Sequence, residues 1–171
     1  MNPFLFSPIK NQKELLKAIE YVHFSCYKLC KRTFGEYLPV AGNIGVFCHY
    51  DSEYEYLTKV REKLTLLNNN INKKYYRLKK PIVIPAKGDV PETTYLHLYI
   101  RRPEVDHPDV GDVDFYLEPE KYYALKESLL KGKKLLGVKI FERADLDLIK
   151  LFDPNIRAAA FVGSNYYTSK K

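Results

Sequence analysis

Apolar residues along this chain follow two spacings, one of three to four residues and one of two, and these spacings predict its helices and strands. The longest helical pattern predicts a helix over about residues 12–33, with an apolar stripe made of Leu15, Ile19, Val22, Cys26 and Leu29. Asn11 and Glu14 have the spacing of a capping box at its start. Gly35 follows it, where glycine commonly ends a helix.

The same helical spacing predicts two shorter helices. Residues 51–67 carry an apolar face formed by Leu57, Val60, Leu64 and Leu67. Ser52 and Glu55 have the spacing of a second capping box. The third helix is expected over residues 119–132, because Pro119 suits a first helical position and Gly132 suits a stop.

Strands are predicted where short runs are rich in β-branched and aromatic residues, at 42–50, 75–84, 95–101, 113–117 and 134–142. Strict alternation in the third run gives it a polar face, made of Tyr95, His97, Tyr99 and Arg101. In the fourth run the apolar residues Val113, Phe115 and Leu117 are expected to point inward. Apolar segments at 146–154 and 158–163 are expected to pack as edge strands.

The order of these elements, a helix followed by β-α-β-β-β-α-β, predicts an α+β fold. We expect a ferredoxin-like sandwich, with an antiparallel-rich sheet and helices on one face. The chain is interpreted as a single domain, residues 1–171. It divides into an N-terminal helical extension (1–41), an α/β core (42–142) and a C-terminal extension (143–171).

Composition is that of a folded domain, with 46% hydrophobic and 29% charged residues among 171. No apolar run is long enough to cross a bilayer, and the first ten residues lack the basic start of a signal peptide. We therefore expect an intracellular, cytoplasmic protein with no membrane partner. The cysteines are odd in number and poorly spaced for zinc, so buried reduced thiols are expected at Cys26, Cys30 and Cys48.

A formal net charge of +7 and 15 tyrosines favour binding to a nucleic acid, DNA or RNA. The strongest run of positive charge contributes candidate phosphate contacts at Lys73, Lys74, Arg77, Lys79 and Lys80. On the polar strand face, Tyr95 and Tyr99 are candidates for stacking on bases, beside Arg101. The alternatives are a lysine-rich strand that discourages edge pairing and a tyrosine face that forms a homo-oligomer or another protein interface.

The stretch VDHPDVGDVDF at 105–115 suggests a second function, a divalent-metal-dependent phosphodiesterase or nuclease. Imidazole and carboxylate groups are ligands for Mg²⁺ or Mn²⁺, and the candidates are His97, His107, Asp112 and Asp114. Pro103, Pro108 and Gly111 favour a simple turn in which aspartates bond their own backbone. Of the two interpretations, the turn is preferred.

Two short motifs also resemble those of rolling-circle replication initiators and relaxases. They are His97-Leu98-Tyr99 on a predicted strand and Tyr123-Ala124-Leu125-Lys126 on the third predicted helix. The resemblance implies a ferredoxin-like domain in which Tyr123 attacks a phosphodiester and becomes joined to the DNA end. The sequence departs from that family at Tyr99, which stands where a second metal-binding histidine is expected. No phosphate-binding loop or nucleophile-elbow motif is present.

Overall fold

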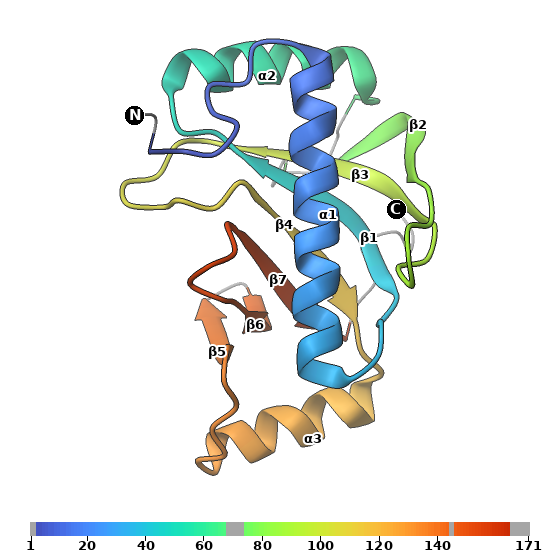
Figure 1. The fold of residues 1–171 in the computed structure, drawn as a ribbon, viewed down its shortest axis with the longest axis vertical. Helices are drawn as coiled ribbons and strands as arrows, with labels where there is room; N and C mark the ends of the chain where they lie inside the picture. The colour runs from blue at the N-terminus through green and yellow to red at the C-terminus, as the bar shows by residue number, and fades with distance from the viewer. Residues whose placement is uncertain (1–2, 68–73, 144–145, 165–171) are drawn as a thin grey trace.

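The computed structural model describes residues 3–67, 74–143 and 146–164, which form three helices and seven strands (Figure 1). The helices are α1 (Gln12–Phe34), α2 (Asp51–Leu64) and α3 (Pro119–Leu130). The first four strands are β1 (Val40–Phe47), β2 (Tyr76–Ile84), β3 (Thr93–Arg101) and β4 (Gly111–Tyr116). The last three are β5 (Val138–Arg143), β6 (Leu146–Leu151) and β7 (Ala158–Gly163).

All seven strands join one sheet, in the order β2-β3-β1-β4-β7-β6-β5. β1 runs parallel to β3 and antiparallel to β4, and β2 runs antiparallel to β3. Most of the strand pairings are antiparallel, so the predicted α+β class with an antiparallel-rich sheet is confirmed. Two features differ from a ferredoxin-like sheet. The strand β3 runs parallel to β1, whereas the strand inserted into a split β-α-β unit is antiparallel to both of its neighbours. A loop, residues 102–110, also joins β3 to β4 where that arrangement has a helix. Pro103 and Pro108 explain the loop, because proline removes helical hydrogen bonds.

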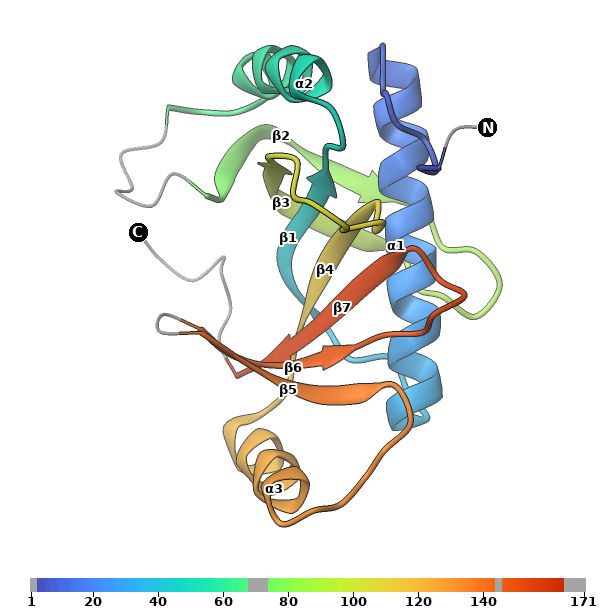
Figure 2. The ribbon, with the colours of Figure 1, turned by 90° about the vertical axis from the view of Figure 1, so that its left-hand side faces the viewer.

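The helix α1 takes the place of the missing crossover helix and packs on β1, β4 and β7. The shorter α2 packs on β2 and β3, where the Arg61 guanidinium lies 3.4 Å from the centre of the Tyr76 ring. Figure 2 shows α1 running along one face of the twisted sheet, with α2 over the β2–β3 end and α3 beyond the β5 end. Within the described ranges, no helix is both long and apolar enough to cross a membrane.

The C-terminal strands are part of the sheet. We expected residues 158–163 to form an edge strand, but β7 lies between β4 and β6, and it pairs with β4 in parallel. The edges are instead β2 and β5. The expectation was wrong because AAAFVG is a short apolar run, and its small residues let β7 pack closely beneath α1.

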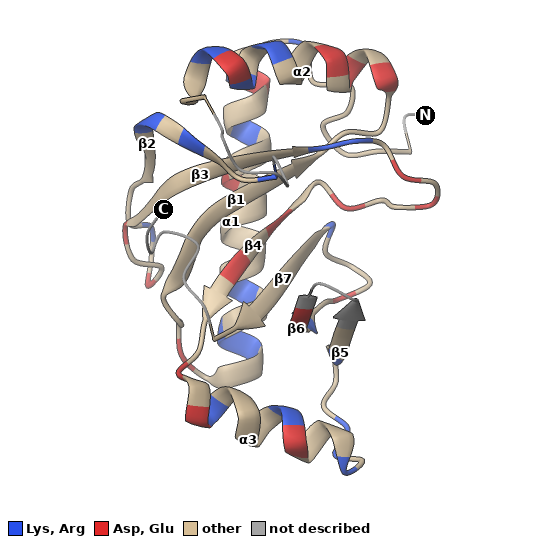
Figure 3. Cartoon of the chain, turned by 180° about the vertical axis from the view of Figure 1, so that it is seen from behind, with Lys and Arg blue, Asp and Glu red and all other residues tan. Residues whose placement is uncertain are grey.

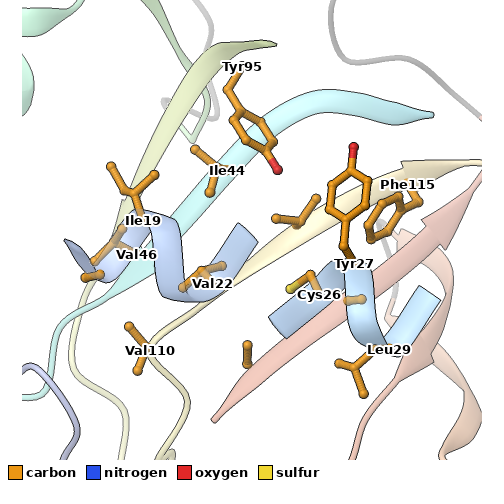
Figure 4. Close-up of a cluster of buried hydrophobic side chains, with 14 of the residues drawn as sticks. Ile19, Val22, Cys26, Tyr27, Leu29, Ile44, Val46, Tyr95, Val110 and Phe115 are labelled. Carbon is orange, nitrogen blue, oxygen red and sulfur yellow. The ribbon is translucent and has the colours of Figure 1, made fainter. Parts of the chain in front are cut away.

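The predicted apolar stripe of α1 forms the core. Leu15, Ile19, Val22, Cys26 and Leu29 are all buried. Figure 4 shows residues of this stripe beside Ile44 and Val46 of β1 and Phe115 of β4. The three cysteines are free and buried, as predicted. Removing one of the large aliphatic side chains would leave a cavity and cost roughly 2–5 kcal/mol of stability.

The capping predictions succeed for α1 and fail for α2. The Asn11 side chain accepts a hydrogen bond from the Glu14 backbone N–H at 2.9 Å, and Gly35 ends the helix with φ 73°. Helix α2 begins after Tyr50, which makes no side-chain cap. The expected capping box of Ser52 and Glu55 is therefore wrong, because the helix begins two residues earlier than that box requires.

The strand β3 does not keep the strict alternation that its sequence suggests. Its pairing with β2 shifts between Arg77 and Ile82, a stretch that includes Pro81, which cannot donate a ladder hydrogen bond. Tyr95 consequently turns toward α1, where it is fully buried and its hydroxyl lies 2.8 Å from Nδ1 of His23. The predicted position of Tyr95 on the polar face is wrong for this reason.

The segment before α1 is attached to α2 through one buried carboxylate, that of Glu53. It accepts hydrogen bonds from the Ser7 hydroxyl at 2.9 Å, the Ile9 N–H at 2.8 Å and the His49 N–H at 2.8 Å. Hydrogen bonds to a charged group are worth more than neutral ones, roughly 1.5–3 kcal/mol each. Glu53 is therefore the main polar link between the N-terminal segment and the sheet.

We predict that Glu53→Gln lowers the free energy of unfolding by about 2 kcal/mol, because an amide cannot accept all three bonds as a carboxylate does. Urea unfolding of the two proteins measures the difference. The matched control is Glu55→Gln, which alters an exposed carboxylate on the same helix and should change stability by less than about 0.5 kcal/mol. Equal stability of the two variants would contradict the role assigned to Glu53.

Candidate functional site

A pocket of about 350 Å³ opens on the face of the sheet opposite α1, which we call the open face. It is lined by side chains from β1, β3, β4, β5, β6 and β7 and by residues on the segments preceding β2 and β4. Figure 3 looks on to this face and shows acidic positions of β4 in the middle of the sheet. The pocket therefore lies over the centre of the sheet, above the strands β1, β4 and β7.

The floor of the pocket is formed by two carboxyl groups on β4. Val113 and Phe115 point into the core, so the alternation of the strand turns Asp112 and Asp114 to the open face. Both are buried, with exposed fractions of 7% and 2%. Gly45 of β1 makes room for the first of them, because a Cβ there would lie 2.1 Å from Asp112 Oδ1.

The two carboxyl groups have different partners. Asp114 Oδ2 accepts a hydrogen bond from Asn43 Nδ2 at 2.8 Å and one from the Tyr75 hydroxyl at 3.4 Å. Asp112 Oδ1 has no hydrogen-bond partner among the described residues, although it is buried. A buried polar atom left unpaired is costly, and such atoms are often retained for function. Asp114 is thus held in place, whereas Asp112 is available to a ligand.

The pKa values of Asp112 and Asp114 differ in the way that these hydrogen-bond partners lead one to expect. Burial, together with the negative charge of Asp114, raises the pKa of Asp112 to about 7. Burial also raises the pKa of Asp114, to about 6, and the hydrogen bonds from Asn43 and Tyr75 limit that rise. When the pair holds one proton, Asp112 carries it, because only Asp114 has donors to stabilise its negative charge. Asp112 can therefore take up and release a proton near neutral pH.

Positive groups surround this acidic floor. Arg101 lies flat against the Phe47 ring, with its guanidinium carbon 3.5 Å from the ring centre. Lys74 lies over Tyr99, 5.2 Å from the ring centre, and Lys150 reaches the pocket from β6. The side chains of Phe141, Leu148 and Phe161 supply an apolar wall. The pocket therefore combines an acid pair, cations and an apolar surface, as small-molecule sites commonly do.

Of the residues predicted from the sequence, the pocket brings together six: Lys74, Tyr99, Arg101, His107, Asp112 and Asp114. The other predicted residues that the structure describes do not line it. His97 pairs with Arg77 in the β2–β3 ladder, and Lys79 donates to the Lys63 carbonyl at 3.2 Å. Lys80 is exposed on β2. Lys73 lies outside the described residues.

The predicted four-residue metal set is not assembled. Across residues 3–67, 74–143 and 146–164, no three histidine, cysteine, aspartate or glutamate side chains are grouped to hold a metal ion. The reason is that His97 does not line the pocket, while Asp114 is hydrogen-bonded to Asn43. The preferred turn interpretation is also only half right. Asp106 lies in the loop with φ 58°, but Asp112 belongs to the central strand β4, together with Asp114, which was expected on a strand.

The combined site implied by the replication-initiator resemblance is not formed either. Tyr123 is 58% exposed on α3 and does not line the pocket. Lys126, which follows it in the motif, forms an ion pair with Asp147 at 2.6 Å. The tyrosine and the β4 carboxyl groups are therefore parts of different surfaces.

The residues missed from the sequence include Asn43 and Gly45, which contact the two carboxyl groups, and Tyr75 and Lys150, which line the pocket. Two of these residues could have been recognised, because each is a polar residue within an apolar strand. Asn43 interrupts the apolar strand VAGNIGVF, and Lys150 interrupts LDLIKL. A polar side chain inside an otherwise buried strand needs a partner or a function. That reasoning would have identified both positions.

We predict that Asp112→Asn makes the protein more stable at pH 8 than at pH 5, relative to wild type. A carboxyl pKa raised on folding contributes stability at low pH, and this contribution is lost as pH rises through about 7. The variant has no such charge, so its relative gain between pH 5 and pH 8 should be about 2 kcal/mol. Urea unfolding at both pH values measures the gain.

The matched control for this experiment is Glu62→Gln, which removes an exposed carboxyl group on α2. It should show a relative gain below about 0.5 kcal/mol. Comparing each variant with itself at two pH values cancels any cost of burying the new amide. If the gain for Asp112→Asn is no larger than that of the control, burial does not raise the pKa of Asp112.

No known protein family matches the sequence, and no curated protein matches it. Among solved structures, the structural-genomics protein EC4020 is similar over 96% of this chain and 94% of its own, with 16% identity and a TM-score of 0.57. A variant of Streptomyces coelicolor methylmalonyl-CoA epimerase in complex with 2-nitronate-propionyl-CoA covers 74% of this chain and 98% of its own, with 14% identity and a TM-score of 0.34. At these identities, the likeness to EC4020 concerns the fold alone, and the overlap with the epimerase supports no inference.

Proposed function

We propose that this protein is an acid–base catalyst that acts on a small molecule bound in the open-face pocket. The observation that carries the proposal is the unequal pair on β4. Asp114 is held by Asn43 and Tyr75, while the buried Asp112, which also lines the pocket, has an oxygen without a hydrogen-bond partner among the described residues. Perturbed carboxyl groups of this kind, inside a pocket, are characteristic of catalytic sites.

The proton transfer needs no other reactant. The ionised Asp112 carboxylate accepts a proton from the ligand, which becomes its conjugate base with the bonding electrons. The protonated Asp112 then returns the proton to the same or a neighbouring atom of the ligand. Asp114 is a positioning residue, since its charge keeps the pKa of Asp112 near neutrality. The cations around the pocket stabilise the negative charge that the ligand acquires.

The Mg²⁺ or Mn²⁺ ion expected from the sequence stays a prediction for this site. Asp112 Oδ1 and Asn43 Oδ1 are both buried oxygens without a hydrogen-bond partner in the described part of the chain. Amide and carboxylate oxygens suit such ions. Each activity measurement is therefore made with added Mn²⁺ and with EDTA, which separates a metal-assisted proton transfer from an unassisted one.

We predict that the protein exchanges acidic C–H protons of small carboxylates or phosphate esters in D₂O, measured by loss of their ¹H NMR signals. Asp112→Asn should reduce the exchange rate at least 100-fold, because it removes the base. The wild-type rate should rise with pH to a plateau above about 7, since the base must be ionised. Glu62→Gln should exchange at the wild-type rate. An Asp112→Asn variant as active as wild type, or no exchange with any compound, would overturn the proposal.

Binding to a nucleic acid is a second candidate function, favoured by a cluster of cations and rings on the open face. The Lys74 ammonium lies 5.0 Å from the centre of the Tyr75 ring and 5.2 Å from that of Tyr99. Lys79 and Lys80 are exposed nearby on the edge strand β2. Such an arrangement can stack bases and neutralise phosphates. The predicted tyrosine-mediated oligomer also stays a prediction.

If this second function is right, the wild type binds labelled single-stranded DNA or RNA with an affinity that falls as salt rises. The double variant Lys79→Gln/Lys80→Gln should bind more weakly and reduce the salt slope by about 2. Lys13→Gln/Lys17→Gln, which removes two exposed charges from α1, is the control. Fluorescence anisotropy at two salt concentrations measures both. Binding that is absent at low salt, or equal in the two double variants, would argue against a nucleic-acid surface on β2.

A further inference from the structure

One end of the open-face pocket gathers two cations and an imidazole ring from three separate parts of the chain. Arg101 is the last residue of β3, His107 lies in the loop before β4, and Lys150 belongs to β6. All three line the pocket together with Asp112. Because like charges repel, side chains from distant elements rarely converge in this way unless an anion joins them.

The aromatic ring of Phe47 fixes two of these groups. The Arg101 guanidinium lies against its face at 3.5 Å, and the His107 ring meets it edge-on, with ring centres 5.4 Å apart and an angle of 80°. The loop carrying His107 is anchored as well, since His49 Nε2 donates to the His107 carbonyl at 2.9 Å. The cationic end of the pocket is therefore built in advance of any ligand.

Two nitrogen atoms at this end have nothing to bind within the protein. Arg101 Nε and His107 Nδ1 are buried and have no hydrogen-bond partner among the described residues. A buried guanidinium nitrogen without an acceptor is expensive, and the planar edge of arginine matches two oxygens of a carboxylate or phosphate. Because Arg101 and His107 both line the pocket, an acceptor group on a ligand bound there would supply the missing partner.

Asp109 and Asp112 offset part of the charge at this end, since both raise the pKa of Lys150 against the effect of its burial. The ion pair that Arg101 makes among the described residues joins its Nη2 to Glu104 Oε2 at 3.7 Å, and the Glu104 side chain is 55% exposed. A long, solvated pair of this kind contributes little. Burial and then the charge of Arg101 lower the pKa of His107, although Asp109 acts in the opposite direction. An incoming oxyanion would relieve this repulsion.

We infer that Arg101, His107 and Lys150 bind the oxyanion, a carboxylate or phosphate, of the small molecule whose proton Asp112 exchanges. The inference rests on the proposed function and names its substrate class. Arg101 makes the directional contact and Lys150 adds a point charge. The apolar body of the ligand lies against Phe141 and Phe161, which line the same cavity. A volume of about 350 Å³ suits a metabolite-sized ligand.

The test uses three probes that share a phenyl ring: benzoate, phenyl phosphate and neutral benzamide. Binding is followed by ¹H–¹⁵N NMR titration at low ionic strength. The wild type should bind at least one of the two anions about 10-fold more tightly than benzamide, because the cations recognise charge. The stronger of benzoate and phenyl phosphate identifies which oxyanion the site prefers.

The decisive variant is Arg101→Gln, with Arg102→Gln as its matched control, because Arg102 is the next residue and is exposed. The first should weaken binding of the preferred anion about 10-fold and leave benzamide unchanged, while the second should stay within about twofold of wild type. Lys150→Gln should also weaken binding of the preferred anion. If the spectrum of Arg101→Gln shows that this variant is not folded, Lys150→Gln replaces it as the decisive variant.

Anion binding by Arg101→Gln as tight as by wild type would overturn the inference. So would benzamide binding as tightly as both anions, or no anion binding at all. Asp112→Asn separates this inference from the proposed function, since at pH 8 it should bind the anion as tightly or more tightly after losing a nearby negative charge. Anion binding with Asp112-independent proton exchange would overturn only the proposed function. Asp112-dependent exchange without anion binding would overturn only the inference.

Discussion

The burial of two carboxyl groups on a central strand is the constraint on which the rest of this structure depends. β4 lies between β1 and β7 and is covered by α1 on one side, so every second residue must face the other side of the sheet. Those residues are Asp112 and Asp114, both almost inaccessible to water. A carboxyl group buried in this way must be protonated, or its charge must be stabilised by hydrogen bonds or by a cation.

The neighbouring strands are adapted to these carboxyl groups. β1 contributes the amide of Asn43 to Asp114 and the bare backbone of Gly45 to the space that Asp112 occupies. Gly111 is equally confined, because a Cβ there would lie 2.0 Å from the Gly45 carbonyl oxygen. The result is an unequal pair, with one carboxylate held and the other free to exchange a proton. This inequality, and not the number of acids, gives the site its chemical character.

The N-terminal segment and α2 support the loop before β4, which contributes His107 to the pocket. Glu53 on α2 holds the N-terminal segment through Ser7 and Ile9, and the Ser7 hydroxyl lies 2.7 Å from His49 Nδ1. The Phe4 ring stacks on the same histidine, with centres 4.2 Å apart. His49 in turn binds the His107 carbonyl. A chain of contacts therefore runs from Phe4 and Ser7 to the cationic end of the pocket, although these segments are far apart in the sequence.

The sequence by itself determined the elements and the α+β class, because amphipathic spacing, caps and turn residues are local properties. The stripe of α1 and the inward positions of β4 could be read directly from it. Tertiary structure decided what local rules cannot express. The shifted pairing beside Pro81 buried Tyr95, and the parallel pairing of β7 with β4 made a presumed edge segment central. The assembly of Asn43, Arg101, Asp112 and Lys150 around one cavity was likewise decided only there, because it depends on strand order and on pairings between residues distant in the chain.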